Sequence, residues 1–168
     1  MNTKVSIIIS VALILIGSVN SSSAEPAQKP PTCASDEHRA FDFWLGEWEV
    51  RARGKEQPHA NSYITKNNNG CSIHERYQTT SGYTGNSLNF YDAANKKWHQ
   101  TWIDIQGSAL YLDGYFANGA MVLSDKLNRI TWTINSNKEV NQVWQTTKDQ
   151  GKTWNVIFDG IYRRIKAK

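Results

Sequence analysis

From residue 47 onward, polar residues alternate with apolar and aromatic ones, and turn-forming residues recur every eight to twelve positions. This period of two, with many β-branched and aromatic side chains, is typical of short consecutive β-strands. We expect ten strands, at residues 47–53, 62–66, 71–79, 87–91, 97–105, 109–116, 120–124, 129–134, 140–146 and 153–165. Such a series predicts an all-β, antiparallel up-and-down barrel of about 8–10 strands, because closure removes the exposed edge strands.

Tight turns separate the expected strands. Asn118 and Gly119 form the clearest hairpin turn, because both residues tolerate the positive φ of a type I′ turn. Gly160 indicates a bulge or bend inside the last strand. A two-sheet sandwich is the alternative fold, but the absence of long crossover connections favours the barrel. A barrel of this size has room for one small ligand unless its own side chains fill it.

One short helix is expected ahead of the first strand. Ser35 can cap it, and the acidic residues that follow suit the positive end of a helix dipole. Phe41, Trp44 and Leu45 share one face at i, i+3 and i+4 spacing, and Gly46 ends the helix. We expect these aromatic residues, with Phe43, to plug one end of the barrel.

The N-terminus has the three parts of a secretory signal peptide. Lys4 supplies the positive charge, residues 5–16 form an apolar core, and small residues lead to a cleavage site after Ala24. An uncleaved membrane anchor is the alternative, but the apolar core is short for a bilayer. The predicted organisation is therefore a signal peptide at 1–24, a flexible proline-rich leader at 25–32 and one barrel domain at 33–168. This organisation predicts an exported protein, periplasmic or secreted.

The chain has two cysteines, Cys33 and Cys71. In an oxidising compartment, two lone cysteines pair with each other more often than they stay free. Closing a loop of this size stabilises a fold by roughly 3 to 4 kcal/mol in the chain-entropy model. A nucleophilic cysteine is the alternative, and it would need a neighbouring base.

Composition limits the partners of the domain. The hydrophobic share of 39% is too high for a disordered chain, and the net charge is only +4. The basic residues are scattered, whereas a nucleic-acid groove needs a concentrated basic surface. No metal-ligand spacing of histidine or cysteine occurs, so we expect neither a metal nor a cofactor. The partners that remain are a small-molecule ligand and another protein.

The strand alternation predicts which side chains face the barrel interior. Three expected strands each place aromatic and polar residues together on one face. A small-molecule site needs apolar walls with a few polar groups, which these faces would supply. The predicted ligand-binding residues are Glu75, Tyr77, Trp98, Gln100, Trp102, Asp104, Gln142 and Trp144. A carboxylate at position 75 inside the barrel must be paired, solvated or neutral.

Other interpretations of the same residues stay open. The aromatic residues could instead form a filled core with the polar groups at a wet rim. Glu75 could pair with Arg76 or another surface cation. Glu75 and Asp104 could also form a general acid and base pair, if strand pairing brought them into one cavity. His74 and His99 lie on the opposite faces of their strands and are expected at the surface or rim.

Two sets of motifs resemble known families. Gly46, Glu47 and Trp48 follow a short helix, as the Gly-x-Trp signature does in lipocalins and other calycins. That resemblance implies that Arg163 or Arg164, on the last strand, packs across Trp48 in a cation–π contact. The segments FDFWLGEWEV (residues 41–50), GC (70–71), WHQTW (98–102) and FDGIYR (158–163) resemble a family of bacterial exported proteins of unknown function that are considered calycin-like.

Three function classes follow from these observations. The first is an exported, lipocalin-like protein that binds a small, partly apolar ligand in its barrel. The second is a filled barrel that acts through its surface as a protein-interaction module of the cell envelope. The third is a small exported enzyme that uses Glu75 and Asp104. A real cavity and a copurifying compound would favour the first class, whereas a filled interior and an exposed apolar patch would favour the second.

Overall fold

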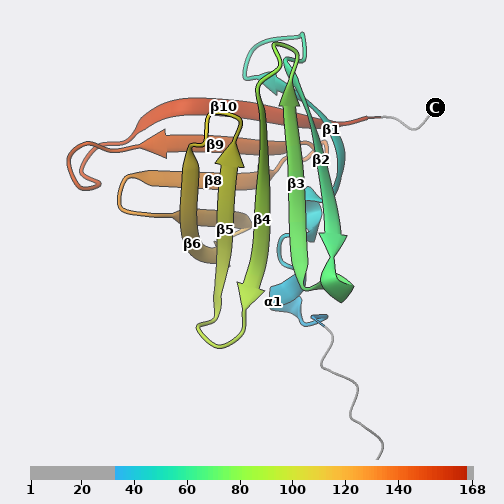
Figure 1. Ribbon diagram of the computed structural model, residues 1–168, viewed down its shortest axis with the longest axis vertical. Coiled ribbons are helices and arrows are strands. Elements are labelled where there is room, and N and C mark those ends of the chain that lie inside the picture. Colours follow the sequence, from blue (N-terminus) through green and yellow to red (C-terminus); the bar gives the residue numbers. More distant parts are fainter. Residues whose placement is uncertain (1–32, 166–168) are drawn as a thin grey trace, which may run out of the picture. The chain divides into compact units, whose positions relative to one another are not determined.

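The computed structural model describes residues 33–165, so the predicted signal peptide and leader lie outside the described residues. Ten antiparallel strands form one closed barrel (Figure 1), as the alternation predicts. The strands are β1 (Gly46–Ala52), β2 (Ala60–Asn67), β3 (Ser72–Thr79), β4 (Thr84–Asp92), β5 (Lys97–Asp104), β6 (Ala109–Ala117), β7 (Ala120–Ser124), β8 (Asn128–Ile134), β9 (Val140–Thr146) and β10 (Asn155–Arg164). No predicted strand end is displaced by more than three residues.

The barrel is a meander in which each strand pairs with its neighbours in sequence. β1 then closes the sheet on β10, with Trp48 opposite Arg164 and Val50 opposite Tyr162. All ten interfaces are antiparallel, and no crossover connection interrupts the series. The sandwich alternative is therefore excluded.

The predicted helix is two shorter pieces, α1 (Asp36–Arg39) and a 3₁₀ turn, η1 (Asp42–Trp44). The Ser35 side chain caps no backbone group, since its hydroxyl hydrogen-bonds His38 Nδ1 at 2.9 Å instead. A 3₁₀ turn eclipses side chains three residues apart. That geometry stacks the rings of Phe41 and Trp44 at 4.9 Å, and both are fully buried beneath the barrel.

The turn at Asn118 and Gly119 is confirmed, with φ values of 53° and 76°. The bulge predicted at Gly160 is misplaced. Gly160 pairs regularly with strands on both sides, and the register shift lies between Val156 and Phe158. The Phe158 ring explains the glycine, because a Cβ at position 160 would lie 2.5 Å from it.

Aromatic side chains fill the end of the barrel that carries α1 and η1, which we call the helix end. The core here includes Phe41, Trp44, Trp48, Trp98, Trp132 and Tyr162. The indole nitrogen of Trp48 donates to the carbonyl of Trp44 at 2.9 Å, which joins β1 to the turn that closes the barrel. The filled aromatic core, which the sequence analysis gave as an alternative for the whole barrel interior, therefore occupies the helix end.

The arginine that covers Trp48 is Arg164, whose guanidinium lies 4.4 Å from the indole centroid. Arg163 projects outward instead and donates to Glu139 at 2.6 Å. Gly46 has a φ of +132°, and a Cβ there would lie 2.3 Å from the Arg164 guanidinium. The Gly-x-Trp signature thus has a local cause, since only glycine leaves room for the arginine.

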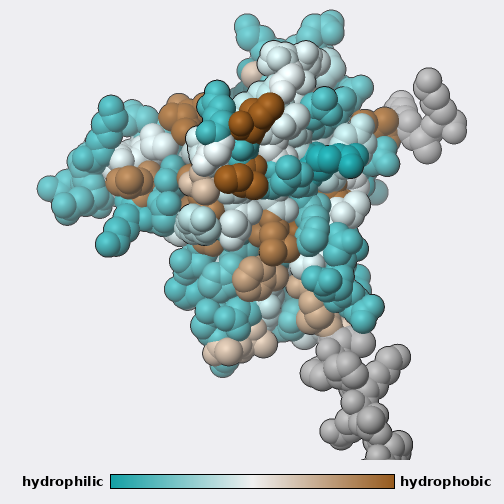
Figure 2. Space-filling model, viewed as in Figure 1, coloured by the Kyte–Doolittle hydropathy of each residue, from teal (hydrophilic) through white to brown (hydrophobic). Residues whose placement is uncertain are grey.

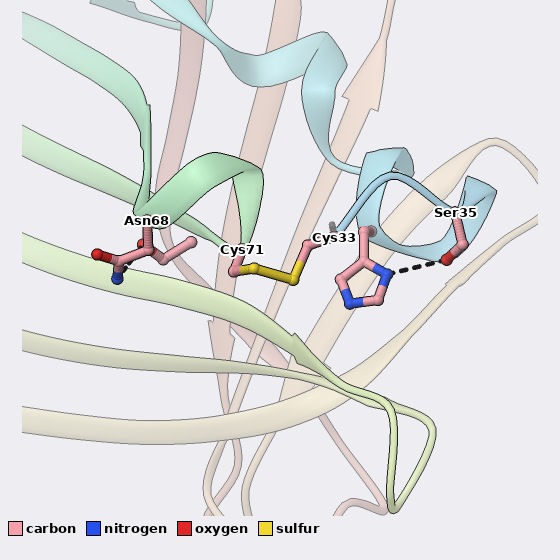
Figure 3. Close-up of a disulfide and its surroundings, with 6 residues drawn as sticks. Cys33, Ser35, Asn68 and Cys71 are labelled. Atoms are coloured by element: carbon pink, nitrogen blue, oxygen red, sulfur yellow. Dashed lines mark hydrogen bonds between the residues drawn. A yellow bond between two sulfur atoms is a disulfide. The ribbon is translucent and has the colours of Figure 1, made fainter. Parts of the chain in front are cut away.

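Cys33 and Cys71 form a disulfide at the helix end (Figure 3). Cys71 follows the short turn η2 (Asn68–Gly70) and directly precedes β3, so the bridge ties the segment before α1 to the barrel wall. The predicted pairing is confirmed. Within residues 33–165, no helix is long and apolar enough to cross a membrane.

Candidate ligand-binding site

A cavity of about 210 Å³ occupies the half of the barrel away from α1. We call this half the loop end, because segments such as 53–59, 80–83 and 105–108 connect its strands there. Six of the eight predicted ligand-binding residues line the cavity: Glu75, Tyr77, Gln100, Trp102, Gln142 and Trp144. The barrel is therefore filled at one end and hollow at the other.

Six of the described residues that line the cavity are tyrosine, tryptophan or phenylalanine. Tyr77 and Trp102 meet edge to face, with ring centroids 6.3 Å apart. The Trp102 ring lies directly over Gly85 on the neighbouring strand, where a Cβ would be 2.0 Å away. Trp144 is fixed by its indole nitrogen, which donates to the side-chain oxygen of Asn128 at 3.0 Å. These contacts hold the rings in place without a ligand.

Glu75 is buried on the inner face of β3, as the strand parity predicts. The hydroxyl of Ser62 donates to one carboxylate oxygen at 2.8 Å, and that of Ser87 donates to the other at 3.2 Å. Burial raises the pKa of Glu75 to about 7, although both serine hydrogen bonds favour the charged form. The pairing with Arg76 does not form, because the Arg76 guanidinium lies over the Tyr63 ring at 4.9 Å.

A chain of buried hydrogen bonds connects Glu75 to a second cavity residue. The Gln100 amide donates to Asn89 at 2.8 Å, and the Asn89 amide donates to the Ser87 hydroxyl at 2.9 Å. Ser87 in turn donates to Glu75. Each member is oriented by the next, so the polar groups facing the cavity are fixed by the barrel interior.

The other two predicted ligand-binding residues, Trp98 and Asp104, do not line the cavity. Trp98 belongs to the core at the helix end, where its indole nitrogen donates to the Glu37 carbonyl at 3.0 Å. Asp104 ends β5 and accepts hydrogen bonds from Tyr83 and from the backbone of Gln106. Desolvation acts to raise the pKa of Asp104, but these hydrogen bonds outweigh it and hold the pKa below its usual value.

The two carboxylates of the enzyme hypothesis therefore do not share the cavity, since Glu75 lines it and Asp104 does not. Strand parity places a side chain on the inner face, but it does not specify how far along the barrel that side chain lies. His74 and His99 are on the outer face, as expected: His74 contacts Ser72, and His99 stacks on Phe90. No cluster of metal ligands occurs among residues 33–165.

The sequence analysis missed seven residues that line the cavity: His59, Thr79, Tyr83, Leu110, Ile130, Phe158 and Tyr162. Strand alternation could have found Ile130, which shares the inner face of β8 with Trp132. Tyr162 donates to the Gln142 amide oxygen at 2.6 Å and so orients a predicted residue. His59 and Tyr83 come from loops at the loop end, where period-two reasoning does not apply.

The fold and the cavity together define the class of this protein. A closed antiparallel meander with an internal, partly aromatic cavity fits a lipocalin-like fold. No protein-family model matches the chain, and no curated protein matches it either. The class therefore rests on the architecture, and membership of the calycin-like exported family stays a prediction.

Proposed function

We propose that this chain is an exported binding protein that holds a small, partly apolar ligand in the loop end of its barrel. The observation that carries the proposal is the cavity of about 210 Å³, walled by aromatic rings and containing a few fixed polar groups. Pockets of this composition are the usual sites for small molecules. The disulfide and the predicted signal peptide support export, because disulfides persist in oxidising compartments.

Native mass spectrometry of the protein purified gently from its exported form tests this proposal. We expect a stoichiometric small molecule that denaturation releases. Leu110→Trp should lower its occupancy by filling the cavity, because Leu110 lines the wall. Tyr111→Trp is the matched control, since the adjacent Tyr111 is 70% exposed on the outer face. A mass without ligand, unchanged after exposure to cell extract, would contradict the proposal.

A second candidate function is a protein-interaction module, which the outer surface favours. Hydrophobic side chains gather over β4 and β5 on the face shown in Figure 2. Leu88 and Ile103 are exposed there, 40% and 48% respectively, and both line a concavity of about 480 Å³. Contiguous exposed apolar surface commonly marks a protein contact. A ligand-free mass in the experiment above would favour this function.

A further inference from the structure

The cavity contains one acid without a counter-ion. Of the described residues that line it, Glu75 alone is acidic, and none is lysine or arginine. Seven side-chain ion pairs occur among residues 33–165, and Glu75 belongs to none of them. Burying a carboxylate costs free energy unless a positive charge pairs with it. A cation bound beside Glu75 would therefore stabilise its charged form.

The hydrogen bonds of Glu75 leave room for that cation. Each carboxylate oxygen accepts one serine hydroxyl, from Ser62 or Ser87. An ionised carboxylate has about four acceptor sites, so roughly two remain free. Among the described residues that line the cavity, only His59 could carry positive charge, but it bonds the Tyr77 hydroxyl at 3.2 Å, and its partial burial lowers its pKa. No described residue therefore supplies a cation to Glu75.

The rest of the wall is suited to a positively charged organic group. Tyr77, Trp102, Trp144 and Phe158 line the same space as Glu75. Aromatic faces attract ammonium groups through their quadrupoles, and the attraction grows when the cation is desolvated. An anionic ligand would face an uncompensated carboxylate, whereas a neutral ligand would leave that carboxylate without a cation.

We infer that the barrel binds a small organic amine as its ammonium ion, with Glu75 as the counter-ion and the aromatic side chains as the walls. The inference rests on the proposed ligand-binding function and specifies the class of ligand. The cavity of about 210 Å³ is smaller than the range of about 300–1,000 Å³ that is usual for drug-sized ligands. The ligand is therefore a compact molecule, with one ring or a short chain beside its amino group.

Isothermal titration calorimetry with two pairs of probes tests the inference. The pairs are 2-phenylethylamine with 2-phenylethanol and hexylamine with hexanol, and each pair differs in charge with little change in shape. At about pH 8, an alkylamine is protonated, as a lysine side chain is. We expect the wild-type protein to bind at least one amine about tenfold or more tightly than its alcohol, which is about 1.4 kcal/mol.

Two variants assign this preference to Glu75. Glu75→Gln keeps the size of the side chain and removes its charge, so it should lose the preference and bind amine and alcohol with similar affinity. Glu47→Gln is the matched control, because Glu47 is exposed on the outer face of β1 and should keep the wild-type preference. Thermal melting of each variant confirms that it folds.

Two results would overturn the inference. If the alcohols bind wild-type protein as tightly as the amines, the amine inference fails while the ligand-binding function stands. If none of the four probes binds at millimolar concentration, the amine inference fails, and the native mass spectrum decides separately whether the ligand-binding function fails with it. A preference for amines that survives in Glu75→Gln would also overturn the role of Glu75.

Discussion

Glu75 makes the stability of the barrel depend on pH. Its pKa rises from 4.5 to about 7 because burial penalises the charged carboxylate. Below pH 4.5, the carboxyl is protonated in both the folded and the unfolded chain, so its ionisation does not lower the free energy of unfolding. As the pH rises through about 7, the folded protein is left with an unpaired buried charge, so stability is lost. The full shift corresponds to about 3 kcal/mol.

We predict that Glu75→Gln removes this loss. The difference in unfolding free energy between Glu75→Gln and wild type should move in favour of the variant by about 3 kcal/mol between pH 4.5 and about pH 8. Urea denaturation across this range measures it, with Glu47→Gln as the control.

The other titratable groups near Glu75 leave this comparison intact. His59, whose pKa burial lowers, is present in both proteins, so its contribution cancels in the difference. Burial raises the pKa of Tyr77, Tyr83 and Tyr162 from 10.0, so these residues stay neutral throughout the range. A constant difference between the two proteins would show that Glu75 is solvated or already paired.

At the scale of elements, β1 and β10 close the barrel, and Trp48 is the residue on which that closure depends. It is fully buried, donates to the Trp44 carbonyl and is covered by Arg164. Truncating a buried aromatic side chain removes its transfer free energy and leaves a cavity. We predict that Trp48→Ala lowers the unfolding free energy by about 3–5 kcal/mol. Any loss of ligand affinity should follow from unfolding alone.

Trp154→Ala makes the same chemical change outside the core and serves as the control. Trp154 lies in the loop between β9 and β10, where its ring packs against Arg129 at 4.3 Å. Its truncation should cost about 1 kcal/mol, in the range of a cation–π contact near the surface. Equal melting temperatures for Trp48→Ala and wild type would mean that the register of β1 against β10 is wrong.

At the scale of the whole molecule, the sequence predicts the architecture better than it predicts depth within the barrel. Alternation correctly places Glu75 and Trp102 on the inner face, because side chains in a strand point to opposite faces by turns. The same parity puts Trp98 inside, yet Trp98 packs at the helix end and Trp102 at the cavity. Which end a residue reaches depends on strand stagger and on the closing turn η1, and both are set by long-range contacts.

The helix end is filled and the loop end is hollow. We therefore expect that a change at the helix end can lower stability without changing ligand affinity. The Cys33–Cys71 bridge lies at the helix end, whereas Tyr77 and Trp102 line the cavity at the loop end. A sequence separation of 38 residues corresponds to a loop-closure contribution of about 4 kcal/mol. Because the bridge restricts the unfolded chain and neither cysteine lines the cavity, its loss should leave the folded site unchanged.

We therefore predict that the double variant Cys33→Ser, Cys71→Ser unfolds at lower urea concentration but keeps wild-type affinity for the probe that binds best. Calorimetry below the melting temperature measures the affinity. Thiol titration of denatured, unreduced wild-type protein is the control and should find no free thiol, since both cysteines are in the bridge. If the variant stays folded yet loses affinity, the helix end shapes the cavity, and the two halves of the barrel are coupled.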